Sequence, residues 1–159
     1  MQNLQHKGPV REMLPADAGR VSEIIASAVR AHFPGHYTDE VAAALISRNR
    51  PEDILGHAPK QLDYVCEHDS RIVAMIGIKK NEIGHLFVDP AAEGLGIGRH
   101  LVEFAVADIR SRGYADLFVL SSLNAVGFYE RCGFAREKGG SFDVLPGLPL
   151  PYVRMGRTV

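Results

Sequence analysis

The sequence has few cysteines. Cys66 and Cys132 are the only two, and they are far apart in the chain. Two cysteines are too few for the disulfide framework of a small secreted protein or for a four-cysteine zinc site. No histidine at a fixed spacing marks either of them as a catalytic thiol. We therefore expect a protein of the reducing cytoplasm that binds no metal.

Long apolar runs and blocks of one charge are also missing. Charge or glycine interrupts every apolar stretch before the ~20 residues that a membrane helix needs, and polar residues follow Met1 where a signal peptide has its apolar core. The 18 Lys and Arg residues and the 19 Asp and Glu residues form no tail of one sign. We expect no membrane or nucleic-acid partner, and the length predicts a single domain over residues 1–159.

Hydrophobic periodicity in the first half of the chain predicts one short strand, two helices and a meander. The helices begin after Pro15 and after Thr38, and apolar residues recur in each at helical spacing. Short polar connections typical of antiparallel hairpins then separate three strand-like runs, at residues 62–67, 72–78 and 83–88.

The second half of the chain alternates helices and strands. An amphipathic helix begins near Gly98 and ends at Gly113, and the apolar run 116–120 follows it as a buried strand. Because a helix connects them, this strand is expected to run parallel to the one before the glycines. Asn124 is expected to cap a short helix, and two last strands flank a 146–151 hinge. The predicted class is α+β (α/β mixed), with a mostly antiparallel central sheet and about four helices.

The turn between the predicted strand 83–88 and the next helix carries three glycines. Gly94, Gly96 and Gly98 have no Cβ atoms, so the backbone there can approach a ligand closely. Free N–H groups at the start of a helix favour an anion such as a phosphate or pyrophosphate. A tight turn with a glycine cap is the alternative interpretation.

Two other phosphate-binding motifs do not fit these residues. A dinucleotide fingerprint requires a glycine where this chain has Leu101, and a P-loop requires Lys and Ser or Thr where it has Arg99 and His100. Neither motif therefore explains the glycine turn.

Two segments of the chain resemble motifs of the GNAT (Gcn5-related) N-acetyltransferases. The central family motif is a strand, then Gln/Arg-x-x-Gly-x-Gly/Ala, then a helix, and it appears here as Glu93-Gly-Leu-Gly-Ile-Gly98. The second family motif, an Asn followed by Phe-Tyr and Gly-Phe pairs, is matched by Asn124-Ala-Val-Gly-Phe-Tyr-Glu-Arg-Cys-Gly-Phe134. The order of the motifs and of the surrounding elements fits over about the whole chain. The resemblance implies the GNAT-like acyl-CoA N-acyltransferase fold.

The resemblance also implies a binding site for acetyl-CoA. Backbone groups of one strand would bind pantetheine, the glycine turn would hold the pyrophosphate, and the second motif would contact the cofactor arm. The residues implied are Phe87, Val88, Glu93, Gly94, Leu95, Gly96, Ile97, Gly98, Arg99, Asn124 and Phe128. Glu93 departs from the family, which has Gln or Arg at this position. The departure matters because a carboxylate beside a pyrophosphate is electrostatically unfavourable.

Acetyl transfer to an amine requires a group that donates a proton and a group that accepts one. The resemblance gives the donor role to Tyr129, whose phenol would protonate the departing thiolate. Glu82 and His85 are the two candidates for the base. Strand alternation places Glu82, Gly84, Leu86 and Val88 on one face and His85 on the other, so these two are not expected to occupy equivalent positions.

The acceptor is expected opposite the cofactor, between the first two helices and the last strands. Polar and aromatic residues of that region are His32, Phe33, His36, Tyr37, Phe142 and Tyr152. His32 and His36 have i, i+4 spacing, but Pro34 and Gly35 interrupt the helix and no third ligand is evident. The sequence therefore does not predict a metal site here. The 146–151 loop is interpreted as part of the acceptor pocket or of a homodimer contact.

The function predicted from these observations is acetyl-CoA-dependent N-acetylation of a small-molecule or protein amine by direct transfer in a ternary complex. The alternative is a non-catalytic acyl-CoA-binding module, which the acidic Glu93 motivates. A third hypothesis, transfer to an amine carried on transfer RNA, is disfavoured by the balanced charge.

Overall fold

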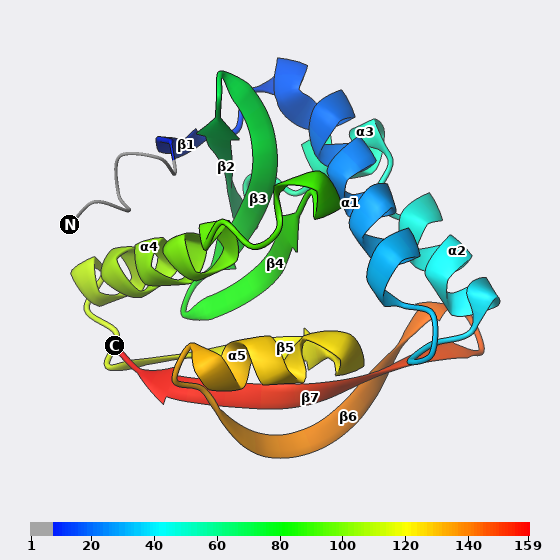
Figure 1. Ribbon diagram of the computed structural model, residues 1–159. Helices are drawn as coiled ribbons and strands as arrows, with labels where there is room; N and C mark the ends of the chain where they lie inside the picture. Colours follow the sequence, from blue (N-terminus) through cyan, green and yellow to red (C-terminus); the bar gives the residue numbers. More distant parts are fainter. Residues whose placement is uncertain (1–7) are drawn as a thin grey trace.

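The computed structural model describes residues 8–159, which form one seven-stranded sheet with helices on both faces (Figure 1). The strands are β1 (Val10–Glu12), β2 (Leu62–His68), β3 (Arg71–Lys79), β4 (Glu82–Val88), β5 (Asp116–Ser122), β6 (Ala135–Leu145) and β7 (Leu148–Thr158). The helices are α1 (Ala18–His32), α2 (Asp39–Ser47), α3 (Pro51–Leu55), α4 (Ile97–Ser111) and α5 (Val126–Arg131). The strand order is β1-β2-β3-β4-β5-β7-β6. The predicted α+β class with a mixed, mostly antiparallel sheet is confirmed.

Two apolar clusters hold the layers together, one on each face of the sheet. Helices α4 and α5 pack on one face through residues such as Leu101 and Ile109, and α1, α2 and α3 pack on the other through residues such as Ile25 and Ile54. Burial of these faces removes apolar surface from water, which is the main force that stabilises the fold.

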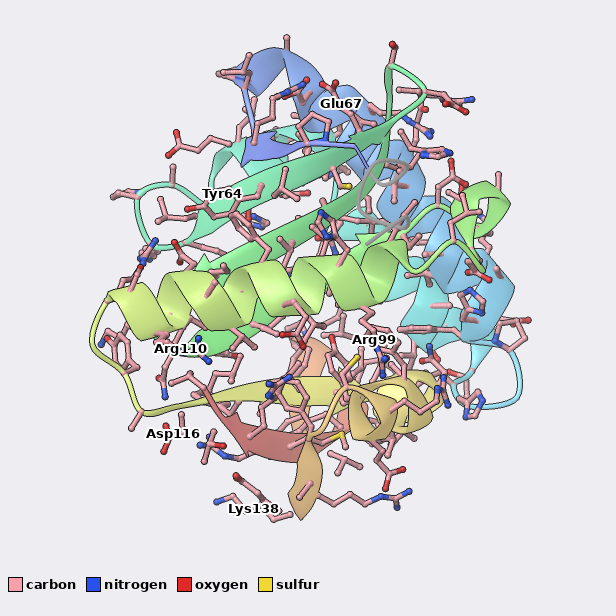
Figure 2. All side chains as sticks on the ribbon, turned by 60° about the vertical axis from the view of Figure 1, so that its left-hand side comes forward. Tyr64, Glu67, Arg99, Arg110, Asp116 and Lys138 are labelled. Atoms are coloured by element: carbon pink, nitrogen blue, oxygen red, sulfur yellow. The ribbon has the colours of Figure 1, made fainter. Side chains whose placement is uncertain are left out.

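Figure 2 shows Arg99 and Arg110 at opposite ends of α4. Arg110 lies in the last turn, where a cation interacts favourably with the helix dipole.

Strands β4 and β5 are the parallel neighbours in the sheet, and they separate soon after they meet. They pair at Glu82 with Phe118 and at Ile83 with Val119. Beyond those pairs both strands continue, β4 to Val88 and β5 to Ser122, without pairing with each other. A gap therefore opens in the middle of the sheet, and the α4 crossover places the glycine turn at the end of β4 beside it.

A β-bulge in β4 changes the predicted faces of this strand. Ile83 pairs with Ile78 and His85 pairs with Gly77, so Gly84 has no partner on β3. One unpaired residue reverses the alternation. Glu82 and His85 consequently lie on the same face of the sheet, and the expectation that they lie on opposite faces is wrong.

The last two strands are longer than predicted. The turn between them is Pro146–Gly147, with a positive φ of 76° at Gly147, and not a hinge over 146–151. Pro149 and Pro151 lie inside β7, in the part that precedes its pairing with β5 at Tyr152. Proline is tolerated there because this stretch has a strand neighbour on one side only, so an N–H on the open side is not needed.

The predicted cap of the short helix is also wrong. Asn124 lies in a one-turn 3-10 helix, and Ala125 is the N-cap of α5, with no side-chain hydrogen bond.

Among residues 8–159 no helix is long and apolar enough to cross a membrane.

Candidate active site

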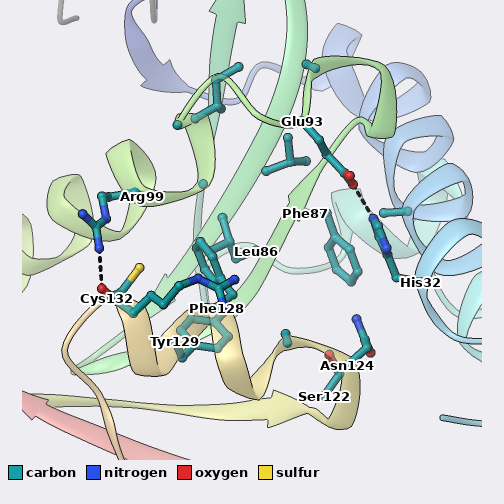
Figure 3. A pocket seen from close by; sticks show the side chains of 18 of the residues that line it. His32, Leu86, Phe87, Glu93, Arg99, Ser122, Asn124, Phe128, Tyr129 and Cys132 are labelled. Atoms are coloured by element: carbon teal, nitrogen blue, oxygen red, sulfur yellow. Dashed lines mark hydrogen bonds and ion pairs between the residues drawn. The ribbon is translucent and has the colours of Figure 1, made fainter.

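A cavity of about 750 Å³ lies where β4 and β5 separate (Figure 3). Its walls come from residues 86–88 of β4, the glycine turn, the start of α4, the β5–α5 turn, α5, Ala28 and His32 of α1, and Phe33 just after α1. Segments far apart in the sequence thus form one site. All of the predicted cofactor residues line the cavity except Leu95, whose side chain is exposed.

The glycine turn at one end of the cavity has backbone conformations that other residues rarely adopt. Gly94 has a φ of 81° and Gly96 a φ of 77°, and Gly96 is the N-cap of the 15-residue helix α4. The first hydrogen bond of this helix joins the His100 N–H to the Gly96 carbonyl. The N–H groups of residues 97–99 therefore have no partner within the helix, which favours binding of an anion.

Gly98 has a different role from the other two glycines. A Cβ atom at Gly98 would lie 3.1 Å from the ring of Phe128, which is tighter than ordinary van der Waals contact. The missing side chain lets the aromatic ring of α5 pack against the start of α4. The glycine motif and the Phe-Tyr motif therefore contact each other, which sequence spacing does not show.

The approach to the glycine turn is anchored on α1. The carboxylate of Asp89 accepts a hydrogen bond from the Ala91 N–H at 3.0 Å and forms an ion pair with Arg20 at 2.6 Å. The Ala91 hydrogen bond and Arg20 both lower the pKa of Asp89. This pair links the end of β4 to α1 on the side of the cavity where the loop begins.

Glu93 interacts with His32 of α1. Figure 3 shows the Glu93 side chain extending toward His32, whose Nε2 contacts the Glu93 Oε1. The two side chains are 44% and 42% exposed, so solvent screens their attraction. His32 was predicted on the acceptor side, but it lines this cavity instead. The carboxylate that departs from the family motif thus has a partner on a different helix.

Arg99 is directed toward α5. Its guanidinium donates to the carbonyl oxygen of Arg131, and the Cys132 thiol lies beside it. Burial raises the pKa of Cys132, and the hydrogen bond from Arg99 opposes that shift. Cys132 and Arg131 line the cavity but were not predicted to do so. Helical spacing gave the signal, because Cys132 is four residues after Phe128.

Asn124 provides a buried polar atom without a partner. Its Oδ1 is inaccessible to solvent and makes no hydrogen bond within residues 8–159, although Asn124 lines the cavity. An unsatisfied buried acceptor costs about 1–3 kcal/mol. A ligand N–H donor in the cavity would remove this cost.

Tyr37 fixes the turn that carries Asn124. Its hydroxyl accepts a hydrogen bond from the Leu123 N–H at 2.9 Å and donates one to the Pro151 carbonyl at 2.6 Å. Burial raises the pKa of Tyr37, so the hydroxyl stays a donor. Tyr37 was expected near the acceptor, and no signal in the sequence indicates this link between the α1–α2 loop, the β5–α5 turn and β7.

Tyr129 lines the cavity and is almost fully buried. Its ring packs edge-on against Phe128 at 5.0 Å and Phe134 at 5.4 Å between centroids. Burial raises the pKa of Tyr129 far above its ordinary value of 10.0. The phenol is therefore protonated at neutral pH, as a proton donor must be.

Glu82 and His85 do not line the cavity; they lie on the face of the sheet that α1, α2 and α3 cover. Burial raises the pKa of Glu82, and the charges of Lys79 and Arg154 oppose that shift. Burial lowers the pKa of His85 to about 4, and His57 adds to this effect. Glu82 is thereby a stronger proton acceptor than an ordinary glutamate, and His85 is uncharged at neutral pH.

Among the remaining predicted acceptor-side residues, Phe33 also lines this cavity, and the others lie outside its wall. Phe33 is buried beside Tyr37, His36 is exposed, and Phe142 packs near Tyr152 with ring centroids 6.3 Å apart. Within the described part of the chain, no three His, Cys, Asp or Glu side chains are placed to hold a metal ion together.

The fold and the two motifs define an acyltransferase of one family. Residues 32–144 match the family model described as an acetyltransferase (GNAT) domain. The chain belongs to the GNAT family of N-acetyltransferases, as the sequence resemblance predicted.

Curated relatives are acetyltransferases too. Serotonin N-acetyltransferase 2, chloroplastic, of Oryza sativa subsp. japonica is 34% identical over 62% of this chain and 55% of its own length. Mycothiol acetyltransferase of Cellulomonas flavigena is 37% identical over 46% of this chain and 22% of its own length. The chain thus spans about half of the rice relative and a smaller part of the bacterial one.

Solved structures show the same fold. A GCN5-related N-acetyltransferase from Rhodopseudomonas palustris superimposes with a TM-score of 0.90 over 96% of both chains, at 21% identity. The PaiA N-acetyltransferase from Thermoplasma acidophilum, solved in complex with coenzyme A, gives a TM-score of 0.77 over 95% of this chain and 98% of its own, at 21% identity.

Proposed function

We propose that this protein transfers the acetyl group of acetyl-CoA directly to a primary amine in a ternary complex. The observation that carries the proposal is the cavity between β4 and β5, which ends at the glycine turn and the N-terminus of α4. Acetyl-CoA supplies the activated thioester. The relatives named for serotonin and mycothiol support a small molecule as the acceptor.

The residues present fit a coenzyme A molecule. The free N–H groups at the start of α4, with the left-handed Gly94 and Gly96, suit a pyrophosphate. The unpaired edge of β4 at residues 86–88 offers backbone donors and acceptors to the amide groups of pantetheine. The unpartnered Oδ1 of Asn124 would accept an amide N–H from the same arm.

Proton transfer is assigned to two residues that approach the sheet from opposite faces. The Tyr129 hydroxyl, in the cavity wall, would donate its proton to the departing sulfur. Glu82, on the other face where β4 and β5 still pair, would accept the proton of the amine, directly or through a water. His85 is not assigned as the base, because its low pKa makes it a poor proton acceptor at neutral pH.

The experiment that tests the proposal is a calorimetric titration of the purified protein with acetyl-CoA and with CoA. A thiol-release assay over a panel that includes serotonin, spermidine and lysine accompanies it. Micromolar binding together with turnover of at least one amine supports the proposal. Binding without turnover on any amine favours the acyl-CoA-binding module, and no binding at millimolar acetyl-CoA contradicts both functions.

Replacing Glu93 by Gln is expected to tighten acetyl-CoA binding by roughly 3- to 5-fold at low salt. The substitution removes a partly exposed negative charge beside the expected pyrophosphate, and a pair of this exposure contributes less than about 1 kcal/mol. Calorimetry at low and high ionic strength measures the change, which salt should reduce. Glu103→Gln, which lies on α4 and is paired with Arg157, controls for net charge. Weaker binding by the Glu93 variant would show that the carboxylate organises the loop instead.

Replacing Tyr129 by Phe is expected to lower kcat about 100-fold while acetyl-CoA affinity is unchanged. The ring and its packing remain, and only the proton donor is lost. Steady-state kinetics and calorimetry on the same preparation measure the two quantities. The control is Tyr114→Phe, which removes a hydroxyl from an exposed tyrosine outside the cavity. A Tyr129 variant with the kcat of the wild type would rule out this phenol as the acid.

Replacing Glu82 by Gln is expected to lower kcat/KM about 10- to 100-fold at neutral pH and to change the pH profile. A base must be deprotonated, so the wild-type rate should fall as the pH drops through the Glu82 pKa, which burial places above its ordinary 4.5. The variant should lack this acidic limb. If the limb persists at the same pH in the variant, another group accepts the proton.

A further inference from the structure

A half-buried polar cluster lies outside the cavity, on the face of the sheet shared by Glu82 and His85. We define the Gln61 cluster as Gln61, Asp63, His57 and His85. The Gln61 amide nitrogen lies 2.7 Å from the Asp63 Oδ1 and 3.0 Å from the His85 Nδ1. The His57 Nδ1 lies 2.8 Å from the Asp63 Oδ2, and the Asp63 side chain is only 4% exposed.

The carboxylate of Asp63 fixes where the protons of this cluster are. An ionised carboxylate only accepts hydrogen bonds, so the nitrogen of the Gln61 amide, and not its oxygen, must face it. The second hydrogen of that nitrogen points to the His85 Nδ1, which therefore accepts. Neutral His85 then carries its proton on Nε2, and His57 carries a proton on Nδ1. The two rings stack 5.1 Å apart in nearly parallel planes, with their protons on different nitrogens.

The side chain of Gln61 also occupies the space above two glycines. A Cβ atom at Gly77 would lie 2.1 Å from the Gln61 Nε2, and one at Gly84 would lie 2.4 Å from the Gln61 Oε1. Real Cβ atoms do not approach other atoms this closely, so both positions require glycine while Gln61 is in place. Gly84 is the unpaired residue of the β4 bulge, and it directly follows the last β4–β5 pair at Ile83.

We propose that Gln61 is a positioning residue for acetyl transfer: it holds the β4 bulge at Gly84 and fixes His85 as the Nε2–H tautomer. This inference rests on the proposed function. The bulge sets the direction of residues 86–88, which form the cavity wall. It also places His85 on the face of Glu82, where the acceptor is expected. Gln61 thereby connects the geometry of both substrates although it does not line the cavity.

The test replaces Gln61 by Ala and, separately, by Met. Gln61→Ala removes both the packing over the glycines and the hydrogen bonds to Asp63 and His85, whereas Gln61→Met keeps a side chain of similar length and removes only the amide that makes those hydrogen bonds. We expect kcat to fall about 10- to 100-fold in Gln61→Ala and by a smaller factor in Gln61→Met, because small displacements of reacting groups are costly. CoA affinity should fall by a smaller factor than kcat in both variants, because residues 86–88 shift while the glycine turn stays intact.

Nitrogen NMR of the histidine side chains measures which ring nitrogen of His85 carries the proton. A purely structural role of Gln61 would leave this tautomer unchanged. In the wild type we expect His85 to have an unprotonated Nδ1 and a protonated Nε2, and in both variants a mixture of the two tautomers. Asn49→Ala is the matched control, because it removes a buried amide that bonds to the Leu45 carbonyl on α2. It should lower the melting temperature without changing kcat or the His85 signals.

Two results would overturn the inference. One is a kcat in Gln61→Ala equal to that of the Asn49 control, and the other is a His85 tautomer that is the same in the wild type and both variants. If Gln61→Ala does not fold, Gln61→Met decides by the same two measurements. The tautomer is measured without turnover, so a wild type that acetylates no amine refutes the proposed function while the hydrogen-bond assignment is still tested separately.

Discussion

The separation of β4 and β5 is the constraint on which the rest of the structure depends. Two parallel strands that pair at Glu82 and Ile83 and then diverge leave a gap in the sheet that side chains of neither strand close. The ends of both strands, the glycine turn and the α5 segment all border that gap. A fully paired sheet would satisfy these backbone groups internally, and it would leave no edge for a ligand to bind.

The glycine turn shows how one short segment meets several physical demands at once. Gly94 and Gly96 adopt left-handed conformations, and Gly98 makes room for the Phe128 ring, so the same glycines shape the backbone and join α4 to α5. Glu93 is accommodated because it contacts His32 on α1. Glu93 departs from the family motif, and the energetic effect of this departure depends on His32, which lies outside the motif.

The two faces of the sheet divide the proposed chemistry. Tyr129 stays protonated because it is buried among aromatic rings, and Glu82 is made more basic because the effect of its partial burial outweighs the opposing charges of Lys79 and Arg154. Burial therefore raises the pKa of both groups, which keeps the phenol protonated before transfer and makes the ionised carboxylate a stronger proton acceptor. His85, more deeply buried beside His57, is driven so far toward its neutral form that it suits hydrogen bonding better than proton transfer.

The sequence by itself determined the order of the elements, the α+β class and the glycine turn, because hydrophobic periodicity and glycine spacing are local signals. The family resemblance added the predicted cofactor residues and Tyr129, but other residues of the cavity wall, such as Ala28, Ser122 and Arg131, were not predicted. Tertiary structure alone decided what depends on distant partners. The bulge at Gly84 puts His85 on the same face as Glu82, and the side chain of Gln61, which directly precedes β2, lies over that glycine. Likewise, the hydroxyl of Tyr37 reaches Leu123 and Pro151 only after folding brings three segments together.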